Sequence, residues 1–114
     1  MEDSGFIENS RTQMRRGVLE YSILLILDRD DEYASTIIRK LKDVDIIVVE
    51  GTLYPLLIRL KNMGLLNYRW QESTQGPPRK YYMITEKGRA QLRELDAAWS
   101  QLVQSIESIR TEKL

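Results

Sequence analysis

The stretch EGTLYPLLIRLKNMGLL, residues 50–66, has the apolar spacing of one helix face but contains a proline. Proline is tolerated in the first turn of a helix, because the backbone N–H groups there have no partner within the helix. We therefore predict that a helix begins at about Gly51–Thr52, with Thr52 as its N-cap and Pro55 in its first turn. The helix is predicted to end near Asn62–Met63, with Gly64 as the first residue beyond the cap.

The N-terminus of this helix is the part that bears on function. Tyr54 projects from the first turn, where backbone N–H groups and the helix dipole attract anions. Such a helix can point its N-terminus at a phosphate backbone or into a groove. An ordinary packed helix that begins with a proline explains the stretch equally well, so the choice depends on the rest of the chain.

The composition narrows the classes of protein and of site. A chain of 114 residues forms one domain with a modest core. It contains no Cys and no His, which removes disulfides, thiolate metal ligands, the thiol nucleophile and the usual general base. We therefore expect no catalytic site, no metal site and no cofactor. The apolar runs are too short to span a bilayer and residues 1–13 lack a signal-peptide core, so we expect a cytoplasmic protein without membrane contact.

Charge is distributed unevenly along the chain. The formal net charge is zero, yet residues 51–93 contain eight basic and two acidic residues, an excess of six positive charges. Because local charge sets the affinity for phosphates, this segment is a candidate nucleic-acid surface. Ordinary solvated helix and strand faces are the alternative explanation for each of these residues taken singly.

Periodicity and turn signals divide the chain into an arm, a globular part and a terminal helix. Residues 1–12 lack apolar periodicity and are expected to form a flexible arm, followed by a domain over 13–84 and a helix within 85–114. The elements expected within 13–84 are a buried helix at 13–28, a second helix at 33–43, a short strand at 46–49, the proline-containing helix, and a β-hairpin of 65–72 and 79–84.

The last helix, 85–110, is expected to have Thr85 as its N-cap and to carry a coiled-coil seam. Its apolar residues follow one another at alternating steps of three and four: Leu92, Leu95, Trp99, Leu102, Ile106 and Ile109. No other predicted helix is long enough to complement this seam, so a second copy of the chain is the expected partner. Packing of this helix against its own domain is the alternative, most of all near Leu92.

The order of these elements, three helices and then a hairpin, is that of a winged helix-turn-helix. We therefore predict a mainly α fold with a small β-hairpin and a long C-terminal dimerisation helix. In such folds the third helix enters the major groove of DNA, so Thr52 and Tyr54 would face the groove. The cations expected at phosphates or in the minor groove are Arg59, Lys61, Arg79 and Lys80.

The same residues resemble a known family. The motif GTLYPLL-x-RL-x₃-GLL, followed by G-x-x-RKYY-x-[IL]-T-x-x-G, is similar to that of the PadR family of bacterial transcriptional regulators, over about Arg15 to Ile109. The resemblance implies a winged-helix homodimer of the small type, a double-stranded DNA operator, and repression that a small molecule relieves. It also implies recognition-helix positions Gly51, Thr52, Leu53, Tyr54 and Pro55, and wing positions Gly76, Pro77, Arg79 and Lys80.

One segment departs from the family pattern. The family often has Y-G-Y-E-I at the start of the second helix, and this chain has YASTI at residues 33–37. The missing glycine and second tyrosine put contacts with DNA at this segment, and any similarity of the operator, in question.

Trp99 lies in the middle of the seam. In a symmetric dimer it meets or approaches its own copy, and two facing indoles can form a slot for a flat aromatic ligand. Some small PadR proteins bind planar drugs at such an interface, and the resemblance places Trp99 at that position. A packed dimer anchor that binds no ligand is the alternative.

Two other classes of function compete with DNA binding. A winged helix that docks another protein, without specific DNA readout, shares the fold but does not require a basic wing. An enzyme requires acid–base or nucleophilic groups or a Gly-rich phosphate loop, which this sequence lacks. The expected function is therefore DNA binding by a homodimer, and the resemblance implies a repressor that is released by a small molecule, with a planar aromatic ligand at Trp99 as one interpretation.

Overall fold

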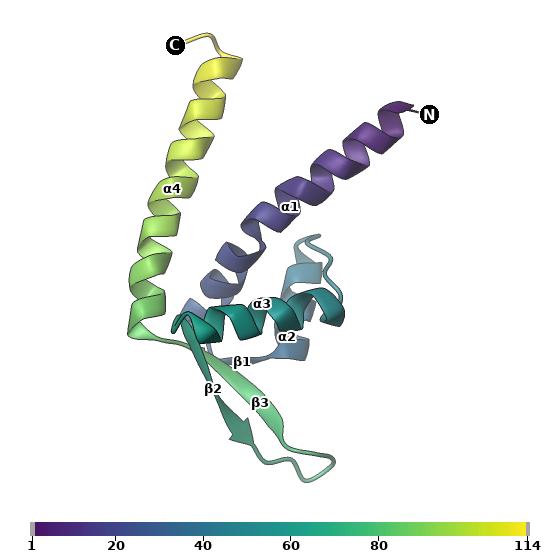
Figure 1. The fold of residues 1–114 in the computed structure, drawn as a ribbon, viewed down its shortest axis with the longest axis vertical. Coiled ribbons are helices and arrows are strands. Elements are labelled where there is room, and N and C mark those ends of the chain that lie inside the picture. Colours follow the sequence, from purple (N-terminus) through teal and green to yellow (C-terminus); the bar gives the residue numbers. More distant parts are fainter. Residues whose placement is uncertain (1, 114) are drawn as a thin grey trace.

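The computed structural model describes the backbone of residues 2–113 and the side chains of residues 5–113. In chain order its elements are α1 (Glu2–Arg29), β1 (Glu32–Tyr33), α2 (Ala34–Asp43), α3 (Glu50–Asn62), β2 (Leu66–Gln71), β3 (Arg79–Ile84) and α4 (Glu86–Arg110). Figure 1 shows α1 and α4 as two diverging arms, with the β2–β3 hairpin, or wing, projecting on the opposite side. The predicted mainly α, winged-helix architecture is confirmed.

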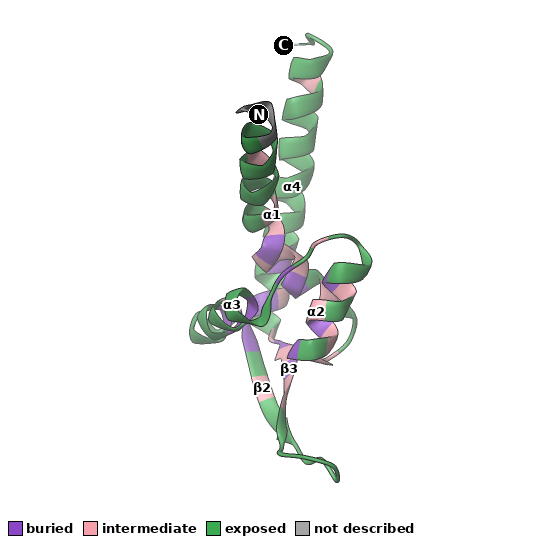
Figure 2. Ribbon diagram, turned by 90° about the vertical axis from the view of Figure 1, so that its right-hand side faces the viewer, coloured by how far each residue is buried: buried purple, intermediate pink, exposed green. Residues whose placement is uncertain are grey.

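The core lies where α1, α2 and α3 meet the base of the wing. Its largest fully buried side chains are Ile23, Leu24, Leu27, Ile37, Leu41, Leu53, Leu57 and Leu66. Figure 2 shows this buried region at the junction of the helices, while the outer parts of α1 and α4 are exposed. Burial of this apolar surface is the main stabilising contribution to the fold.

The three strands form one antiparallel sheet in the order β1–β3–β2. The pairs Leu66↔Ile84, Tyr68↔Tyr82 and Trp70↔Lys80 lie opposite one another, so they share one face of the wing. Burial falls along this face from Leu66, at 2% exposed, to Trp70, at 61%. The wing is therefore anchored at its base and open to solvent toward its tip.

The prediction of a short strand at residues 46–49 is wrong. This segment has no regular structure, and the third strand is instead β1, whose Tyr33 pairs with Tyr81 of β3. The N–H of Ile46 bonds to the carbonyl of Leu41, so the segment closes the end of α2 and does not pair with the sheet. Val48 is buried, which accounts for the apolar run.

The predicted arm at 1–12 is also wrong over the described residues, because α1 begins at Glu2. Extending an existing helix costs much less free energy than nucleating one, and no proline interrupts this segment. The buried helix predicted at 13–28 therefore continues outward as one arm, although few of its first residues contact the core.

Helix α3 begins earlier than predicted. Its first residue is Glu50 and its N-cap is Val49, so Thr52 is not the N-cap and Pro55 lies beyond the first turn. The missing N–H of Pro55 leaves the carbonyl of Gly51 without its usual helical donor, and Gly51 is exposed, so water can replace it. The proline is thus tolerated on the solvent side of the helix.

The predicted end of α3 and start of α4 are confirmed, and the two meet. Gly64 has a φ of 79°, and the N–H of Leu65 bonds to the carbonyl of Leu60 at 3.0 Å, as in a Schellman cap. The Oγ1 atom of Thr85 accepts from the N–H of Gly88 at 2.9 Å and donates to the carbonyl of Gly64 at 2.6 Å. One hydroxyl therefore joins the end of α3 to the start of α4.

A hydrogen bond and a contact between aromatic rings connect α1 with α4. The hydroxyl of Tyr21 in α1 donates to Oδ1 of Asp96 in α4 at 2.5 Å, and the Tyr21 ring lies 6.3 Å from that of Trp99. This hydrogen bond, with smaller effects of burial and of the Asp96 charge, raises the pKa of Tyr21 above its ordinary value.

No helix in the described part of the chain is long and apolar enough to cross a membrane.

Candidate nucleic-acid interface and helical cleft

The start of α2, the start of α3 and the wing enclose a cavity of about 440 Å³, which we call the wing cavity. Aromatic and basic side chains dominate its lining, which consists of Tyr33, Ala34, Ser35, Glu50, Tyr54, Trp70, Pro78, Arg79, Lys80 and Tyr82. The fold thus brings Tyr54 of the predicted recognition helix together with Arg79 and Lys80 of the predicted wing. Basic and aromatic groups around one concavity suit a phosphodiester backbone.

Arg79, the first residue of β3 on the tip side of the wing, is held in a defined position. Its guanidinium carbon lies 3.9 Å from the centre of the Tyr33 ring, and its Nη2 donates to Oγ of Ser35 at 2.7 Å. Stacking on a ring and a hydrogen bond both restrict the long side chain before any ligand binds. Tyr33 and Ser35 belong to the segment that departs from the family pattern, so their part in the site was missed from the sequence.

Two lysines share an aromatic support between α3 and the wing. The Nζ atom of Lys80 lies 4.5 Å from the centre of the Tyr68 ring and 5.5 Å from that of Trp70. The Nζ atom of Lys61 lies 5.5 Å from the same Tyr68 ring. Both amines therefore concentrate positive charge on one side of α3, and their contact with phosphates stays a prediction.

Arg59 is separated from this cluster. Its Nε atom lies 3.5 Å from Oε2 of Glu20 in α1, so the guanidinium faces the body of the domain. Arg69 of the wing, which the sequence analysis did not select, stacks 4.6 Å from the Tyr81 ring and lies 3.6 Å from Asp31. Both cations are partly neutralised by acids, although exposed ion pairs of this kind bind weakly.

The other residues predicted to contact DNA differ in whether they are buried or exposed. Leu53 is fully buried on the same side of α3 as Leu57 and Leu60. Its side chain therefore packs α3 on the core and cannot contact DNA directly. Gly51, Thr52 and Pro55 are exposed on α3, and Gly76 and Pro77 are exposed in the turn of the wing.

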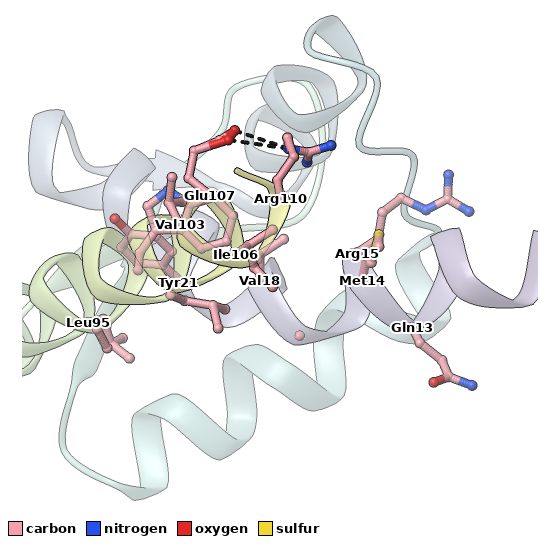
Figure 3. Close-up of a pocket in the computed structure, with 14 residues that line it drawn as sticks. Gln13, Met14, Arg15, Val18, Tyr21, Leu95, Val103, Ile106, Glu107 and Arg110 are labelled. Atoms are coloured by element: carbon pink, nitrogen blue, oxygen red, sulfur yellow. Dashed lines mark hydrogen bonds and ion pairs between the residues drawn. The ribbon is translucent and has the colours of Figure 1, made fainter. Parts of the chain in front are cut away.

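The two arms enclose a second cavity of about 790 Å³, the helical cleft, shown in Figure 3. It is lined by Gln13, Met14, Arg15, Gly17, Val18, Tyr21, Leu95, Ala98, Trp99, Leu102, Val103, Ile106, Glu107 and Arg110. Trp99, Leu102, Ile106 and Ile109 are each at least 44% exposed, so the described residues leave most of the predicted seam uncovered. Leu92 is 3% exposed and belongs to the core, so its assignment to the dimer seam is wrong; α4 passes directly over the domain there.

Helix α1 contributes half of this cleft, which the sequence analysis missed. Met14, Gly17, Val18 and Tyr21 lie opposite the α4 seam, and Met14 is 72% exposed. A signal was present in the sequence, because Ile7, Ser10, Met14, Gly17 and Tyr21 follow the same three- and four-residue steps as the α4 seam. Its small residues conceal the pattern from a search for apolar side chains.

Neither cavity has the residues of a metal site. Among the described residues, no group of three or more Asp, Glu, His or Cys side chains could hold an ion.

The chain matches known transcriptional regulators over most of its length. A sequence model described as the "Transcriptional regulator PadR-like family" matches residues 23–94. A PadR-like transcription factor from Bacteroides fragilis has a similar structure, with 58% identity, a TM-score of 0.77, and coverage of 89% of this chain and 98% of that one. A PadR family regulator from Eggerthella lenta has 32% identity and a TM-score of 0.85, with 96% of each chain covered. A PadR-like regulator from Bacillus cereus has 37% identity and a TM-score of 0.77, with 85% of this chain and 95% of that one covered.

Proposed function

Because the chain belongs to the PadR-like family of transcriptional regulators, we propose that it is a homodimeric repressor, which binds a two-fold symmetric operator and is released by a small molecule. Family membership makes the chain a transcriptional regulator and not an enzyme, as the sequence analysis expected. The repressor role, the dimer, the individual contact residues and the ligand are parts of the proposal.

The observation that carries the DNA-binding part is the concentration of positive charge in the wing cavity and beside it, around Tyr68. Arg79 and Lys80 come from the wing and Lys61 from α3, and aromatic rings support all three cations. A wing that docks a protein does not need this concentration of charge, whereas a wing that approaches phosphates does. This favours the DNA-binding function over the protein-interaction module.

The unpartnered seam supports the homodimer. Exposed apolar side chains extend along both arms, from Phe6 and Met14 on α1 to Ile106 and Ile109 on α4. A contiguous apolar surface of this kind indicates an interaction site, and a two-fold axis lets the same surface cover itself. A dimer would then present two wings and two copies of α3 to adjacent half-sites, about 34–36 Å apart.

Aromatic groups at the base of the cleft support a planar ligand. Trp99 is 44% exposed, lines the helical cleft and lies beside Tyr21, and two copies of this arrangement would flank the dimer axis. Flat aromatic molecules gain both apolar burial and ring stacking in such a slot. Asp96, bonded to Tyr21, is an acidic group beside this slot, while Arg15, Glu107 and Arg110 line the cleft itself, so the charges do not select the sign of the ligand.

A selection of random duplexes tests this function directly. The full chain is mixed with a randomised duplex library at low and at near-physiological salt, and the retained DNA is sequenced. Enrichment of a pseudo-palindrome with half-sites about one helical turn apart supports a specific dimeric regulator. Weak, salt-sensitive retention with no motif contradicts it and favours a protein-interaction module.

Replacing Arg79 by alanine is expected to weaken binding to every duplex by about tenfold at physiological salt. The slope of log affinity against log salt should fall by about 0.9 for each lost phosphate contact. Titrations at four salt concentrations, by fluorescence anisotropy, measure both quantities. Lys80→Ala should behave in the same way.

Arg11→Ala is the matched control for this charge change. Arg11 is exposed on the α1 arm and lies 3.6 Å from Glu8, away from the wing cavity. The Arg11→Ala variant should have nearly the same affinity for DNA, and the same salt slope, as the parent chain. A loss equal to that of Arg79→Ala would show that net charge, and not a contact, sets the affinity.

Trp99 is expected to report ligand binding. The chain has two tryptophans, so Trp70→Phe leaves Trp99 as the sole emitter and Trp99→Phe leaves Trp70. A planar aromatic dye, such as ethidium, should quench Trp99 in the DNA-free protein, and Trp99→Ala should weaken its binding by about tenfold through lost stacking. Equal quenching of Trp70 in the Trp99→Phe chain would contradict a ligand site in the cleft.

A further inference from the structure

The outer side of α3 carries a row of exposed residues. The buried side of the helix consists of Leu53, Leu57 and Leu60. Positions at helical spacing on the opposite side form what we call the outer row: Gly51, Tyr54, Pro55, Ile58 and Asn62. In Figure 2, α3 protrudes from the body of the domain and is largely exposed. The row contains no charged side chain.

Ile58 is the centre of this row. Its side chain is 55% exposed and lies outside the hydrophobic core cluster. Its helical neighbour Tyr54 is 43% exposed, so the two present a continuous apolar strip. The family motif leaves this position open, in GTLYPLL-x-RL, so Ile58 is a feature of this chain and not of the motif.

The cations of α3 lie at the flanks of the row. Lys61 turns toward Tyr68 in the wing, and Arg59 turns toward Glu20 in α1. Neither is placed at the centre, where an Arg or Lys would form a bidentate contact with guanine. The helix therefore has an apolar, uncharged centre with a basic wing beside it, which fits a groove between two phosphate backbones.

The apolar group that the major groove offers is the C5-methyl of thymine. A third helix that enters the groove with Ile58 at its centre would bury this methyl against the isoleucine side chain, and each such contact stabilises the complex. We propose that Ile58 is a specificity-determining residue that recognises a thymine methyl in each half-site. This inference rests on the proposed DNA-binding function and names the base feature that the site detects.

The test uses the operator obtained from the duplex selection. Each thymine is replaced in turn by deoxyuridine, which lacks only the C5-methyl, and the dissociation constant is measured. At one or two positions per half-site the parent chain should bind about threefold to tenfold more weakly. Ile58→Ala should bind the thymine operator more weakly by a similar factor and should not distinguish thymine from uracil at those positions.

Ile47→Ala is the matched control for loss of an exposed isoleucine. Ile47 is 69% exposed in the loop before α3 and lies outside the outer row and the wing cavity. This variant should retain the parent affinity and the full preference for thymine. Thermal melting of both variants verifies that they are folded, which is expected because neither side chain belongs to the core.

Three outcomes separate this inference from the proposed function. Failure to enrich any operator overturns the proposed function and the inference with it. An operator whose affinity is insensitive to uracil at every position overturns the inference alone. An Ile58→Ala chain that still prefers thymine at the sensitive positions also overturns it, because the outer row would then be free of bases and open to another partner.

Discussion

Replacing Gly88 by alanine is expected to lower the free energy of unfolding by about 3 kcal/mol or more, because the added methyl group has no room. A Cβ atom at this position would lie 2.1 Å from the carbonyl oxygen of Leu65 and 2.7 Å from Cγ1 of Ile84. The nearest atom belongs to the backbone and cannot move away as a flexible side chain would. The start of α4 would therefore have to separate from the end of α3.

The damage is expected to extend beyond one contact. The Leu65 carbonyl also accepts from the N–H and the hydroxyl of Thr85, and the Thr85 hydroxyl caps α4 at Gly88. Moving the helix apart would weaken these bonds together and would alter where α3 ends. Helices α3 and α4 would then no longer be held in a fixed relative position.

Thermal unfolding followed by circular dichroism measures this effect. The midpoint Tm of Gly88→Ala should fall by about 10 °C or more. Gly76→Ala is the control, because a Cβ at Gly76 meets nothing within 4 Å and its φ is not positive, so its Tm should match that of the parent. A Gly88→Ala chain with the Tm of the parent would show that the junction yields more easily than its geometry implies.

Replacing Leu102 by glutamate is expected to separate the proposed dimer, with the dissociation constant rising about a thousandfold. Leu102 lies in the middle of the helical cleft and is 55% exposed in the single chain, with apolar neighbours Val103 and Ile106. Two-fold symmetry places the change twice in one interface, so two carboxylates would be desolvated without a partner. Operator affinity should fall by at least about a hundredfold, because each half-site would bind its own monomer.

Sedimentation velocity over a range of concentrations measures the dimer. Gln104→Glu adds the same charge on the opposite side of α4 and should leave both the dimer and the operator affinity unchanged. A Leu102→Glu chain that remains dimeric at low concentration would contradict the cleft as the interface. A parent chain that is monomeric at every concentration would contradict the homodimer itself.

Much of the candidate site could not be predicted, because it depends on packing between residues that are distant in the sequence. Leu53 belongs to the motif at the recognition helix, yet it is fully buried, because the contact surface of a helix is set by the side that packs on the core. Arg59 and Arg79 look equivalent as cations, but one lies against Glu20 of α1 and the other against Tyr33 and Ser35. These partners are distant in sequence and come together only when α1, α2 and the wing are assembled.

Elements whose signals lie within a few residues follow from the local sequence alone. Gly64 ends α3 because a left-handed residue is required there, Thr85 caps α4, and the alternation of Leu66 and Tyr68 specifies the wing. The motif and the charge between residues 51 and 93 were enough to indicate a DNA-binding regulator.

The exact starts of the helices and the residues that they pack against depend on tertiary packing. Val49 and not Thr52 caps α3, residues 46–49 close α2 instead of forming a strand, and α1 continues from Glu2 to complete the cleft with α4. The physical reason is the range of the interactions: caps, turns and pleats depend on neighbours along the chain, whereas burial, ion pairs and clefts depend on which helices pack together.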